Sequence, residues 1–304
     1  MNRAVLDVSE GVGGPLRGWG RYVAMLARAL GDAVTPVAGR VRGPELLWEQ
    51  VGLPRALRRR GAGLVHAPNC FLPLVRPCPG VVTVHDLAFE AFPGDFGART
   101  RWKYATFTPR SVASAERVIV PSRATFEDVV ARYGVVESKL RVIPEAPALP
   151  IGGLEPPGGD YLLAVGDVRL KKNLGVARAA AERLGVELVV AGLGGPLGYV
   201  DDARLDALMR GARCLVHPSL YEGFGLVVLE AMARGTPVAC ADATALPETA
   251  GGAAELFDPS DAVACADAIE RAVAAGGERG LARAAEFSWE RTAAMTRAVY
   301  EELL

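Results

Sequence analysis

Residues 214–239 of this 304-residue chain read CLVHPSLYEGFGLVVLEAMARGTPVA. The apolar run at residues 214–217 predicts a buried strand, which Pro218 ends. A glycine-containing loop follows and leads into an apolar helix from about Leu226. A glycine and a proline close that helix, and residues 238–241 predict the next strand. The stretch therefore predicts one unit of a doubly wound parallel sheet, in which ligands bind outside the carboxyl ends of the strands.

Two carboxylates stand in this unit, Glu222 in the loop and Glu230 about one turn inside the helix. The unpaired N–H groups of Phe224, Gly225 and Leu226 at the predicted helix start would suit a phosphate. Carboxylates would repel a phosphate, but they suit the neighbouring hydroxyls of a sugar or a ribose. A nucleotide-sugar combines these groups. The alternative is that both acids only favour the helix start electrostatically.

Residues 217–238, HPSLYEGFGLVVLEAMARGTPV, resemble the donor-site signature of retaining glycosyltransferases of family 4 (GT-B type, glycosyl transferases group 1). The two glutamates eight positions apart belong to that signature. In the family the first faces the transferred sugar and the second binds the nucleotide ribose, which assigns a catalytic role to Glu222 and ribose binding to Glu230. The resemblance implies an α/β protein with two Rossmann-like doubly wound domains facing across a cleft.

The composition is that of a globular protein, with 50% hydrophobic and 23% charged residues. A net charge of −1 gives no support for nucleic-acid binding. Five cysteines show neither metal-ligand spacing nor a paired framework, so we expect a reducing, cytoplasmic setting. No apolar run has transmembrane length, and the N-terminus lacks a signal-peptide pattern.

The first half alternates strands with helical patterns, which predicts a parallel sheet. The expected strands span residues 4–8, 64–67, 81–85, 117–120 and 141–143. A glycine-rich stretch at residues 11–20 lies between the first strand and a helix, and its spacing does not match G-x-G-x-x-G. The segment GWGRY at residues 18–22 resembles the family's first glycine loop, which implies that Gly18 and Gly20 lie beside the donor phosphates.

His85 ends its predicted strand, directly before Asp86. A lone histidine is more often a packed core residue, but the carboxyl end of a strand is where open sheets bind ligands. The family has a histidine-aspartate motif here whose histidine lines the active cleft, so the resemblance gives His85 a catalytic role. His66 and His217 occupy similar strand ends, and we interpret both as structural.

Two basic runs lie on predicted helices of the first half, Arg55 with residues 58–60, and Arg99, Arg101, Lys103 and Arg110. A solvated face is the usual explanation. The alternative is peripheral contact with anionic lipid at the inner face of the membrane, to which each basic residue would contribute about 1 kcal/mol.

A proline- and glycine-rich segment at residues 144–159 is the predicted interdomain linker. The strand after it exits into a basic turn, where Lys172-Asn173 matches a KN-type motif of the family and assigns Lys172 to the leaving diphosphate. Many members carry an arginine directly after the glycine equivalent to Gly166, whereas this chain has Asp167. Arg169 is the substitute candidate for the phosphates.

Relatives insert a helix and a strand after the strand predicted at residues 187–191. Here residues 193–197 intervene, too few for a parallel crossover, which needs about a dozen residues. The second domain is therefore expected to lack one β/α unit that ordinarily borders the nucleotide pocket.

These features predict an N-terminal acceptor-side domain at residues 1–148, a linker at 149–160, a donor domain at 161–286 and a C-terminal helix at 287–304 that packs back on the first domain. Ser288 is the expected N-cap of that helix.

The predicted function is transfer of a hexose, mannose or glucose, from a nucleoside-diphosphate sugar to an acceptor hydroxyl with retention of anomeric configuration. The donor is a GDP-, UDP- or ADP-sugar, and the acceptor is a saccharide, a lipid or a small molecule. No cofactor is expected, and no metal, because no Asp-x-Asp triplet stands at a strand end. The alternatives are a nucleotide-sugar-binding protein that has lost catalysis and, ranked below it, an epimerase of the same fold.

Overall fold

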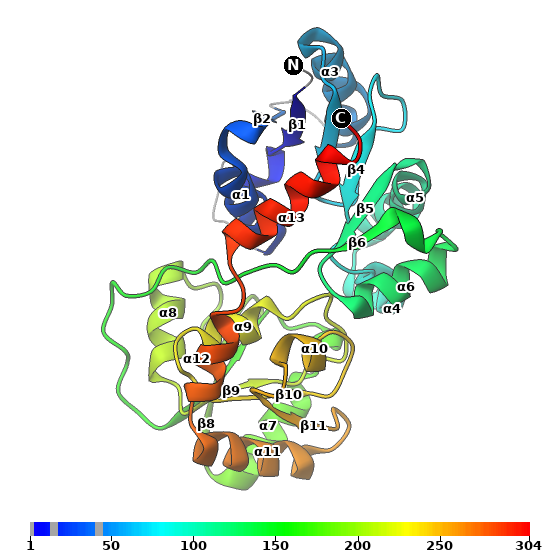
Figure 1. The fold of residues 1–304 in the computed structure, drawn as a ribbon. Helices are drawn as coiled ribbons and strands as arrows, with labels where there is room; N and C mark the ends of the chain where they lie inside the picture. The colour runs from blue at the N-terminus through cyan, green and yellow to red at the C-terminus, as the bar shows by residue number, and fades with distance from the viewer. Residues whose placement is uncertain (1–2, 13–17, 40–44) are drawn as a thin grey trace. The chain divides into compact units, whose positions relative to one another are not determined.

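The computed structural model describes residues 3–12, 18–39 and 45–304, which form two units (Figure 1). Unit 1 contains residues 1–145 and 288–304, and unit 2 contains residues 146–287. Each unit is a parallel sheet with helices, which confirms the predicted α/β class with two doubly wound sheets.

The sheet of unit 1 has the strand order β2-β1-β3-β4-β5-β6, and every pair of neighbours is parallel. Its strands are β1 (Ala4–Asp7), β2 (Val34–Val37), β3 (Leu64–Ala67), β4 (Gly80–Thr83), β5 (Arg117–Val120) and β6 (Leu140–Val142). The chain passes from β1 to one side and from β3 to the other, so the switch point of this sheet lies between β1 and β3.

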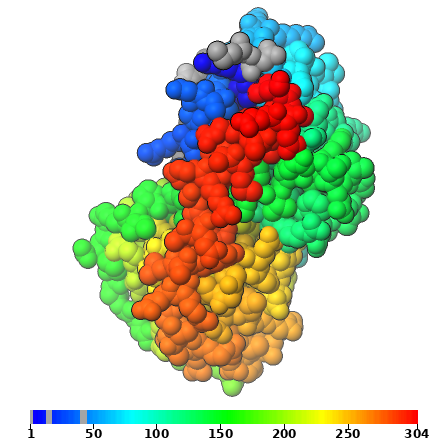
Figure 2. All heavy atoms as spheres, in the orientation of Figure 1, coloured from blue at the N-terminus to red at the C-terminus, as the bar shows by residue number. Residues whose placement is uncertain are grey.

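The helices of unit 1 are α1 (Gly18–Leu30), α2 (Glu45–Leu47), α3 (Leu53–Arg60), α4 (Ala88–Ala91), α5 (Ala98–Ser114), α6 (Arg123–Tyr133) and α13 (Trp289–Glu301). Single 3₁₀ turns occupy Ser9–Gly11, Gly31–Ala33, Pro93–Asp95 and Glu137–Lys139, and a π-helical turn, η3 (Trp48–Gly52), joins α2 to α3. The apolar face of α1 is buried through Tyr22, Val23 and Leu26, and α13 packs against this helix. Figure 2 shows α13, in red, lying over the blue α1 on the surface of unit 1.

Hydrogen bonds fix α13 at both of its ends. Ser288 is the N-cap, and its side chain accepts a hydrogen bond from the Arg291 amide. Near the other end, the Tyr300 hydroxyl lies 2.7 Å from Nδ1 of His66, a fully buried residue of β3. The other ring nitrogen of His66 lies 2.8 Å from the Thr83 hydroxyl, so this histidine is a structural link between the sheet and α13.

Two boundaries of unit 1 differ from the sequence prediction. β4 ends at Thr83, so His85 lies in the following loop, two residues beyond the strand. Gly18 and Gly20 stand in the first turn of α1 and not in the loop before it, and residues 13–17 of the glycine-rich stretch lie outside the described residues.

Unit 2 has the strand order β11-β10-β9-β7-β8, again all parallel. Its strands are β7 (Tyr161–Val165), β8 (Glu187–Ala191), β9 (Cys214–His217), β10 (Val238–Ala241) and β11 (Glu255–Phe257). Its helices are α7 (Leu174–Leu184), α8 (Asp202–Gly211), α9 (Leu226–Met232), α10 (Leu246–Ala250), α11 (Ala262–Ala275) and α12 (Glu278–Ala284), with a 3₁₀ turn, η6 (Leu170–Lys172), before α7. The switch point lies between β7 and β9.

β8 is an edge strand, and the chain returns from it through a tight turn and α8 to β9. Gly192 and Gly198 pair across this turn in a single antiparallel bridge. No strand lies between β8 and β9 in the described sequence, which agrees with the expected loss of one β/α unit.

Residues 146–154, which we call the strap, belong to unit 2 and lie within the segment that the sequence predicts as the interdomain linker. Ala146 and Leu149 are buried, and Leu149 joins the core of unit 2. Figure 1 shows the strap, in green, running beside α8. The proline and glycine content predicts a linker and does not reveal the side chains that bind this backbone.

No helix in the described parts of the chain combines the length and the apolar composition needed to cross a membrane.

Candidate active site

Three side chains of unit 2 meet at its switch point. Lys172, in the turn after β7, places its Nζ 2.5 Å from Oε1 of Glu222, in the loop after β9. Nε2 of His217, the last residue of β9, lies 3.0 Å from the same oxygen. The structure therefore brings the predicted catalytic residues Lys172 and Glu222 together, and it adds His217, which the sequence interpretation assigned to structure alone.

Burial and charge fix the protonation states of this cluster. Burial alone would raise the pKa of Glu222, but the ammonium of Lys172 and the hydrogen bond from His217 outweigh it and hold this pKa well below its usual range. Burial lowers the pKa of His217, and the hydrogen bond to Glu222 only partly offsets that effect. The cluster is thus a lysine–carboxylate ion pair with a neutral histidine that donates its Nε2–H.

Backbone geometry places this ion pair. Gly166, directly after β7, has φ +141°, and a Cβ built there would lie 3.0 Å from Cε of Lys172, so the absence of a side chain leaves room for the lysine stem. The amide of Glu222 donates a hydrogen bond to Oγ1 of Thr244, whose φ of +48° is unusual for a residue with a branched side chain. Such strained positions are typical of ligand sites.

The predicted phosphate seat follows Glu222 at the start of α9. Gly225 is the N-cap with φ +100°, and a Cβ there would meet Cδ2 of Leu246 at 2.8 Å. The Thr249 hydroxyl donates a hydrogen bond to the carbonyl of Phe224, which holds the loop in place. Phe224 and Gly225 are buried, and Leu226 is half-buried.

Arg169 lies on the rim of the same turn. Its Nη2 is 3.6 Å from Oδ2 of Asp167, and the other oxygen of Asp167 accepts a hydrogen bond from the Leu193 amide at 3.0 Å. Asp167 therefore ties the loop after β7 to the loop after β8, and Arg169 remains exposed above it.

Glu230, the predicted ribose ligand, contacts the strap. Its Oε1 accepts hydrogen bonds from the amides of Ala148 and Leu149 at 2.7 and 2.8 Å, and its Oε2 accepts one from Arg234 at 2.9 Å. The side chain is 6% exposed. A ribose at this carboxylate would share it with backbone amides that the sequence pattern did not reveal.

Arg234 is the centre of a buried charge network that holds the strap. Its side chain is 0% exposed and donates to Asp206 Oδ1 at 2.8 Å and to the carbonyls of Leu149 and Pro150. Asp206, equally buried, also accepts from Arg210 at 2.8 Å and from the Gly152 amide at 3.0 Å. The single sequence signal was the four-residue spacing of Glu230 and Arg234, which places both on one helical face.

In unit 1, His85 is buried between two acceptors. Its Nε2 lies 2.8 Å from the Pro68 carbonyl oxygen and its Nδ1 lies 2.9 Å from Oε1 of Glu145. Hydrogen bonds to both require either that both ring nitrogens carry protons or that Glu145 is protonated. The sequence gave Glu145 no role, although it stands three residues beyond the end of β6.

Aromatic rings enclose His85. Trp19, between Gly18 and Gly20, stacks on the imidazole with centroids 6.0 Å apart and planes at 20°. The Tyr22 ring is nearly perpendicular to the imidazole, at 83°, with centroids 4.6 Å apart. Gly18 is exposed with φ +36°, and Gly20 is buried. The structure thus brings the first turn of α1 to His85, and the contacts run through Trp19.

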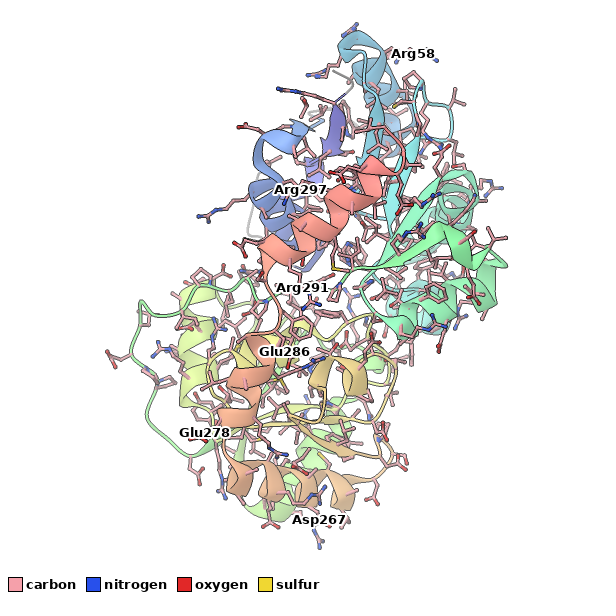
Figure 3. All side chains as sticks on the ribbon, viewed as in Figure 1. Arg58, Asp267, Glu278, Glu286, Arg291 and Arg297 are labelled. Carbon is pink, nitrogen blue, oxygen red and sulfur yellow. The ribbon has the colours of Figure 1, made fainter. Side chains whose placement is uncertain are left out.

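The two basic runs differ in how exposed their side chains are. Arg55 and residues 58–60 are exposed on α3, while Leu53 and Leu57 turn inward. Figure 3 shows Arg58 on that exposed surface. Lys103 does not belong to such a face. Its Nζ lies 3.0 Å from Glu45 and 2.8 Å from Glu49, so its grouping with the exposed arginines of α5 is wrong.

Across residues 3–12, 18–39 and 45–304, no three His, Cys, Asp or Glu side chains converge in a way that could hold a metal ion. The five cysteines carry free thiols, and Cys214 and Cys240 are fully buried in the core as predicted.

Comparison with known proteins identifies relatives of both units. Residues 24–146 match the family model described as Glycosyltransferase Family 4, and residues 195–280 match that described as Glycosyl transferases group 1. The chain is 31% identical over 295 residues to O-antigen chain mannosyltransferase B of Escherichia coli, an alignment that covers 82% of this chain and 76% of that protein.

Solved structures share the fold. Sucrose-phosphate synthase from Thermosynechococcus elongatus superimposes with a TM-score of 0.75 at 21% identity, covering 99% of each chain. Alr3699/HepE from Anabaena, solved in complex with UDP-glucose, gives a TM-score of 0.72 at 17% identity and covers 99% of this chain and 100% of its own.

Proposed function

We propose, from the premise that this chain belongs to glycosyltransferase family 4 and has the GT-B fold, that it transfers a hexose from a nucleoside-diphosphate sugar to an acceptor hydroxyl with retention of anomeric configuration. Family membership supports the class of enzyme and of donor. The stereochemistry, the sugar and independence from metal are part of the proposal.

The observation that carries the proposal is the Lys172–Glu222 ion pair at the switch point of unit 2. Ligands of open α/β sheets bind at such points. A diphosphate needs a cation, and a sugar needs hydroxyl acceptors. The ion pair presents one cation, Lys172, and one acceptor of hydroxyl hydrogen bonds, Glu222, joined by a single hydrogen bond.

In the proposed step the bond between the sugar C1 and the phosphate oxygen breaks, and its electron pair leaves with the diphosphate. The acceptor oxygen attacks C1 from the same face, and its proton passes to an oxygen of the departing phosphate. Lys172, Arg169 and the amides around Gly225 would stabilise the developing charge, a contribution that is large in a water-poor site. No carboxylate is needed as a nucleophile, in contrast to retaining glycosidases.

The remaining site residues have positioning roles in this proposal. Glu222 orients the transferred sugar, held by Lys172 and His217. Glu230 already accepts two hydrogen bonds from amides of the strap, and it binds the ribose hydroxyls with its remaining capacity to accept hydrogen bonds. His85 lines the reacting centre, held in one orientation by Pro68 and Glu145.

The name of the Escherichia coli relative favours mannose as the sugar and a glycan as the acceptor. The complex of Alr3699/HepE with UDP-glucose shows that the fold accommodates a nucleotide-sugar. We propose cytoplasmic action, with peripheral contact to lipid through the exposed arginines of α3 when the acceptor is membrane-bound.

Titration calorimetry with GDP-mannose, UDP-glucose, ADP-glucose and dTDP-glucose, in buffer with excess chelator, tests donor binding directly. We expect one nucleotide series to bind. At 100 times its dissociation constant, that ligand should raise the free energy of unfolding by about 2.7 kcal/mol, which thermal unfolding with and without the ligand checks. Glu222→Gln should weaken binding of the sugar nucleotide but not of the free nucleoside diphosphate, because Glu222 faces the sugar.

Three outcomes would contradict parts of the proposal. Binding that appears only after Mg²⁺ or Mn²⁺ is added contradicts metal independence. Conversion of the sugar without an acceptor indicates an epimerase. Tight binding without turnover on any acceptor indicates a binding protein that has lost catalysis.

A further inference from the structure

His85 has a hydrogen-bond partner at each of its ring nitrogens. Its Nε2 lies 2.8 Å from the carbonyl oxygen of Pro68, and its Nδ1 lies 2.9 Å from Oε1 of Glu145. The side chain of His85 is 5% exposed, and that of Glu145 is 9% exposed. A histidine that takes a proton from a hydroxyl needs a free ring nitrogen for that hydroxyl. Neither nitrogen is free in this arrangement, so the contribution of His85 to catalysis depends on the orientation and the protons of its ring.

The two partners determine where the protons of this ring lie. A backbone carbonyl only accepts hydrogen bonds, so Nε2 carries a proton. The contact between Nδ1 and Glu145 needs one more proton, which is attached either to Nδ1 or to the carboxyl group. A half-turn of the ring would place C–H groups at both oxygen acceptors. Glu145 therefore holds a proton at Nδ1 and, together with Pro68, fixes the orientation of the imidazole.

The segment that carries Glu145 is tied to two elements of unit 1. The amide of Ile143 donates a hydrogen bond at 2.9 Å to the carbonyl of Val120, the last residue of β5. The carbonyl of Pro144 accepts a hydrogen bond at 2.7 Å from Oγ1 of Thr292, near the start of α13. Because Pro144 directly precedes Glu145 and Thr292 is buried, α13 fixes the backbone beside the carboxylate through a contact that excludes water.

α13 also reaches His85 from the side of α1. The Trp289 ring, at the first position of α13, lies 5.8 Å from the Tyr22 ring, centroid to centroid. The Tyr22 ring is the one that lies perpendicular to the imidazole. The helix therefore contacts an aromatic neighbour of His85 as well as the residue that precedes its carboxylate partner.

Two threonines of α13 form a matched pair. Thr292 and Thr296 are both buried, and the hydroxyl of each lies within hydrogen-bond distance of the carbonyl four residues earlier, at 3.1 and 2.8 Å. Thr292 also donates to Pro144, at the shorter distance of 2.7 Å. Valine has nearly the same shape as threonine, so comparing the two threonine-to-valine variants isolates the contact with the segment that carries Glu145.

We propose that Glu145 and Thr292 are positioning residues for His85. Thr292 fixes the backbone before Glu145, and Glu145 holds the imidazole with a proton at Nδ1. This inference rests on the proposed transferase function, in which His85 lines the reacting centre, and adds to it the residues that support this histidine. It also gives α13 a part in the reaction, because the helix supplies Thr292. Neither positioning residue touches a substrate in this proposal, since their polar groups are used within unit 1.

Nitrogen-15 NMR of the histidine rings tests the support of His85 without any substrate. The chain contains three histidines, so each ring can be assigned from single histidine-to-glutamine variants. In the wild type we expect the Nε2 signal of His85 to be that of a protonated nitrogen and the Nδ1 signal to be that of a hydrogen-bonded one. Glu145→Ala should move the Nδ1 signal toward that of a free, unprotonated nitrogen. Thr292→Val should move it less in the same direction, and Thr296→Val should leave it in place.

Transfer kinetics, with the donor that binds in calorimetry and mannobiose as the acceptor, test the effect on the reaction. A misplacement of about 1 Å can cost about 100-fold in rate, so Glu145→Ala should lower kcat about 10- to 100-fold. Donor binding in calorimetry should not change, because the proposed donor ligands Glu222 and Glu230 belong to unit 2. Glu145→Gln should keep most of the activity, because its amide can donate a hydrogen bond to Nδ1. Thr292→Val should lower kcat about threefold to tenfold, and Thr296→Val should leave it unchanged.

Three results would overturn the proposal. The first is an Nδ1 signal of His85 that Glu145→Ala leaves in place. The second is a response to Thr292→Val, in the NMR signal or in kcat, no larger than the response to Thr296→Val. The third is a kcat of Glu145→Ala equal to that of the wild type. If circular dichroism shows that Glu145→Ala does not fold, the comparison of the two valine variants decides.

Failure of this inference is distinguishable from failure of the proposed function. Transfer that proceeds equally well in the wild type and in Glu145→Ala would remove the positioning role and leave the transferase proposal standing. Absence of transfer in the wild type would contradict the proposed function, whereas the NMR signals would still show whether Glu145 and Thr292 hold His85.

Discussion

Buried carboxylates of the two units have pKa values that are shifted in opposite directions. In unit 2 burial raises the pKa of Glu222 and of Asp206, but nearby cations and hydrogen bonds outweigh it and both pKa values are lowered. In unit 1 burial dominates and raises the pKa of Asp7, and it raises the pKa of Glu49 to about 7 although Lys103 lies beside it. In unit 2 the cations outweigh the effect of burial on these pKa values, and in unit 1 they do not.

The cation partners of the acids in unit 2 fit the donor that we propose for that unit. Fixed ion pairs with positive partners suit a donor that combines a diphosphate with sugar hydroxyls. If this interpretation is correct, removing charges should cost most in unit 2 and least at the solvent-exposed rim of unit 1.

Arg234→Met should have the largest effect. It leaves Asp206 and Glu230 buried without their shared cation, and breaking a buried pair costs about 3–5 kcal/mol. Urea unfolding measures the loss of stability. The matched control is Arg210→Met, which also contacts Asp206 but is 24% exposed and should cost about 1 kcal/mol or less. Equal losses in the two variants would show that burial does not govern this network.

Lys172→Met should lower kcat about 100- to 1,000-fold, the effect of removing one donor that stabilises a developing anion. It also leaves Glu222 unpaired, so the single variant should lose stability. The double variant Lys172→Met/Glu222→Gln should regain stability and remain inactive. Recovery of activity in the double variant would mean that the lysine acts only by neutralising Glu222.

His66 should make unit 1 sensitive to acid. Burial lowers the pKa of His66 from 6.5 to about 3. Between these two pH values, His66 binds a proton in the unfolded chain and not in the folded chain. Stability is therefore full above pH 6.5 and falls with pH, by roughly 1.4 kcal/mol per pH unit, or about 2–3 kcal/mol by pH 4.5. His66→Gln should flatten that part of the stability–pH curve. An unchanged slope would assign the acid sensitivity to other groups.

Glu302→Gln should have the smallest effect. Glu302 contacts Arg117 and Arg141, each at 2.6 Å, but all three side chains are between 26% and 33% exposed. Pairs of this kind contribute about 0–1 kcal/mol and are screened by salt. Thermal unfolding in low and high salt checks this, and a loss comparable to that of Arg234→Met would invalidate the contrast between buried and exposed charges.

Local sequence was sufficient for most of the elements and for part of the site, although β2 and β11 were not predicted. The strand at residues 214–217, the loop carrying Glu222 and the strand at residues 238–241 form as predicted, because apolar runs, glycines and a proline fix them within a few residues. The short turn after β8 likewise showed that no crossover could fit there.

Pairings between distant residues could not be predicted in this way. His217 looks the same as His66 in the sequence, since both end an apolar strand, yet one contacts Glu222 and the other contacts Tyr300. Lys103 is one of several basic residues on α5, and only the fold shows that it is bound to Glu45 and Glu49.

The strap is the clearest case of this limit. Its prolines and glycines are typical of a free linker, because the residues that hold it stand more than 50 positions away in α8 and at the end of α9. A sequence does not show which side chain a backbone amide will contact. The contact of Glu230 with the strap amides could therefore not be predicted.

The most direct test of the central claim is a transfer reaction followed by NMR. The donor that binds in calorimetry is incubated with mannobiose, and release of the nucleoside diphosphate and the anomeric configuration of the product are recorded. We predict release that depends on the acceptor, a product with the anomeric configuration of the donor, and loss of both in Lys172→Met/Glu222→Gln. Release of the nucleoside diphosphate that does not depend on the acceptor, an inverted product, or full activity of the double variant would contradict the account.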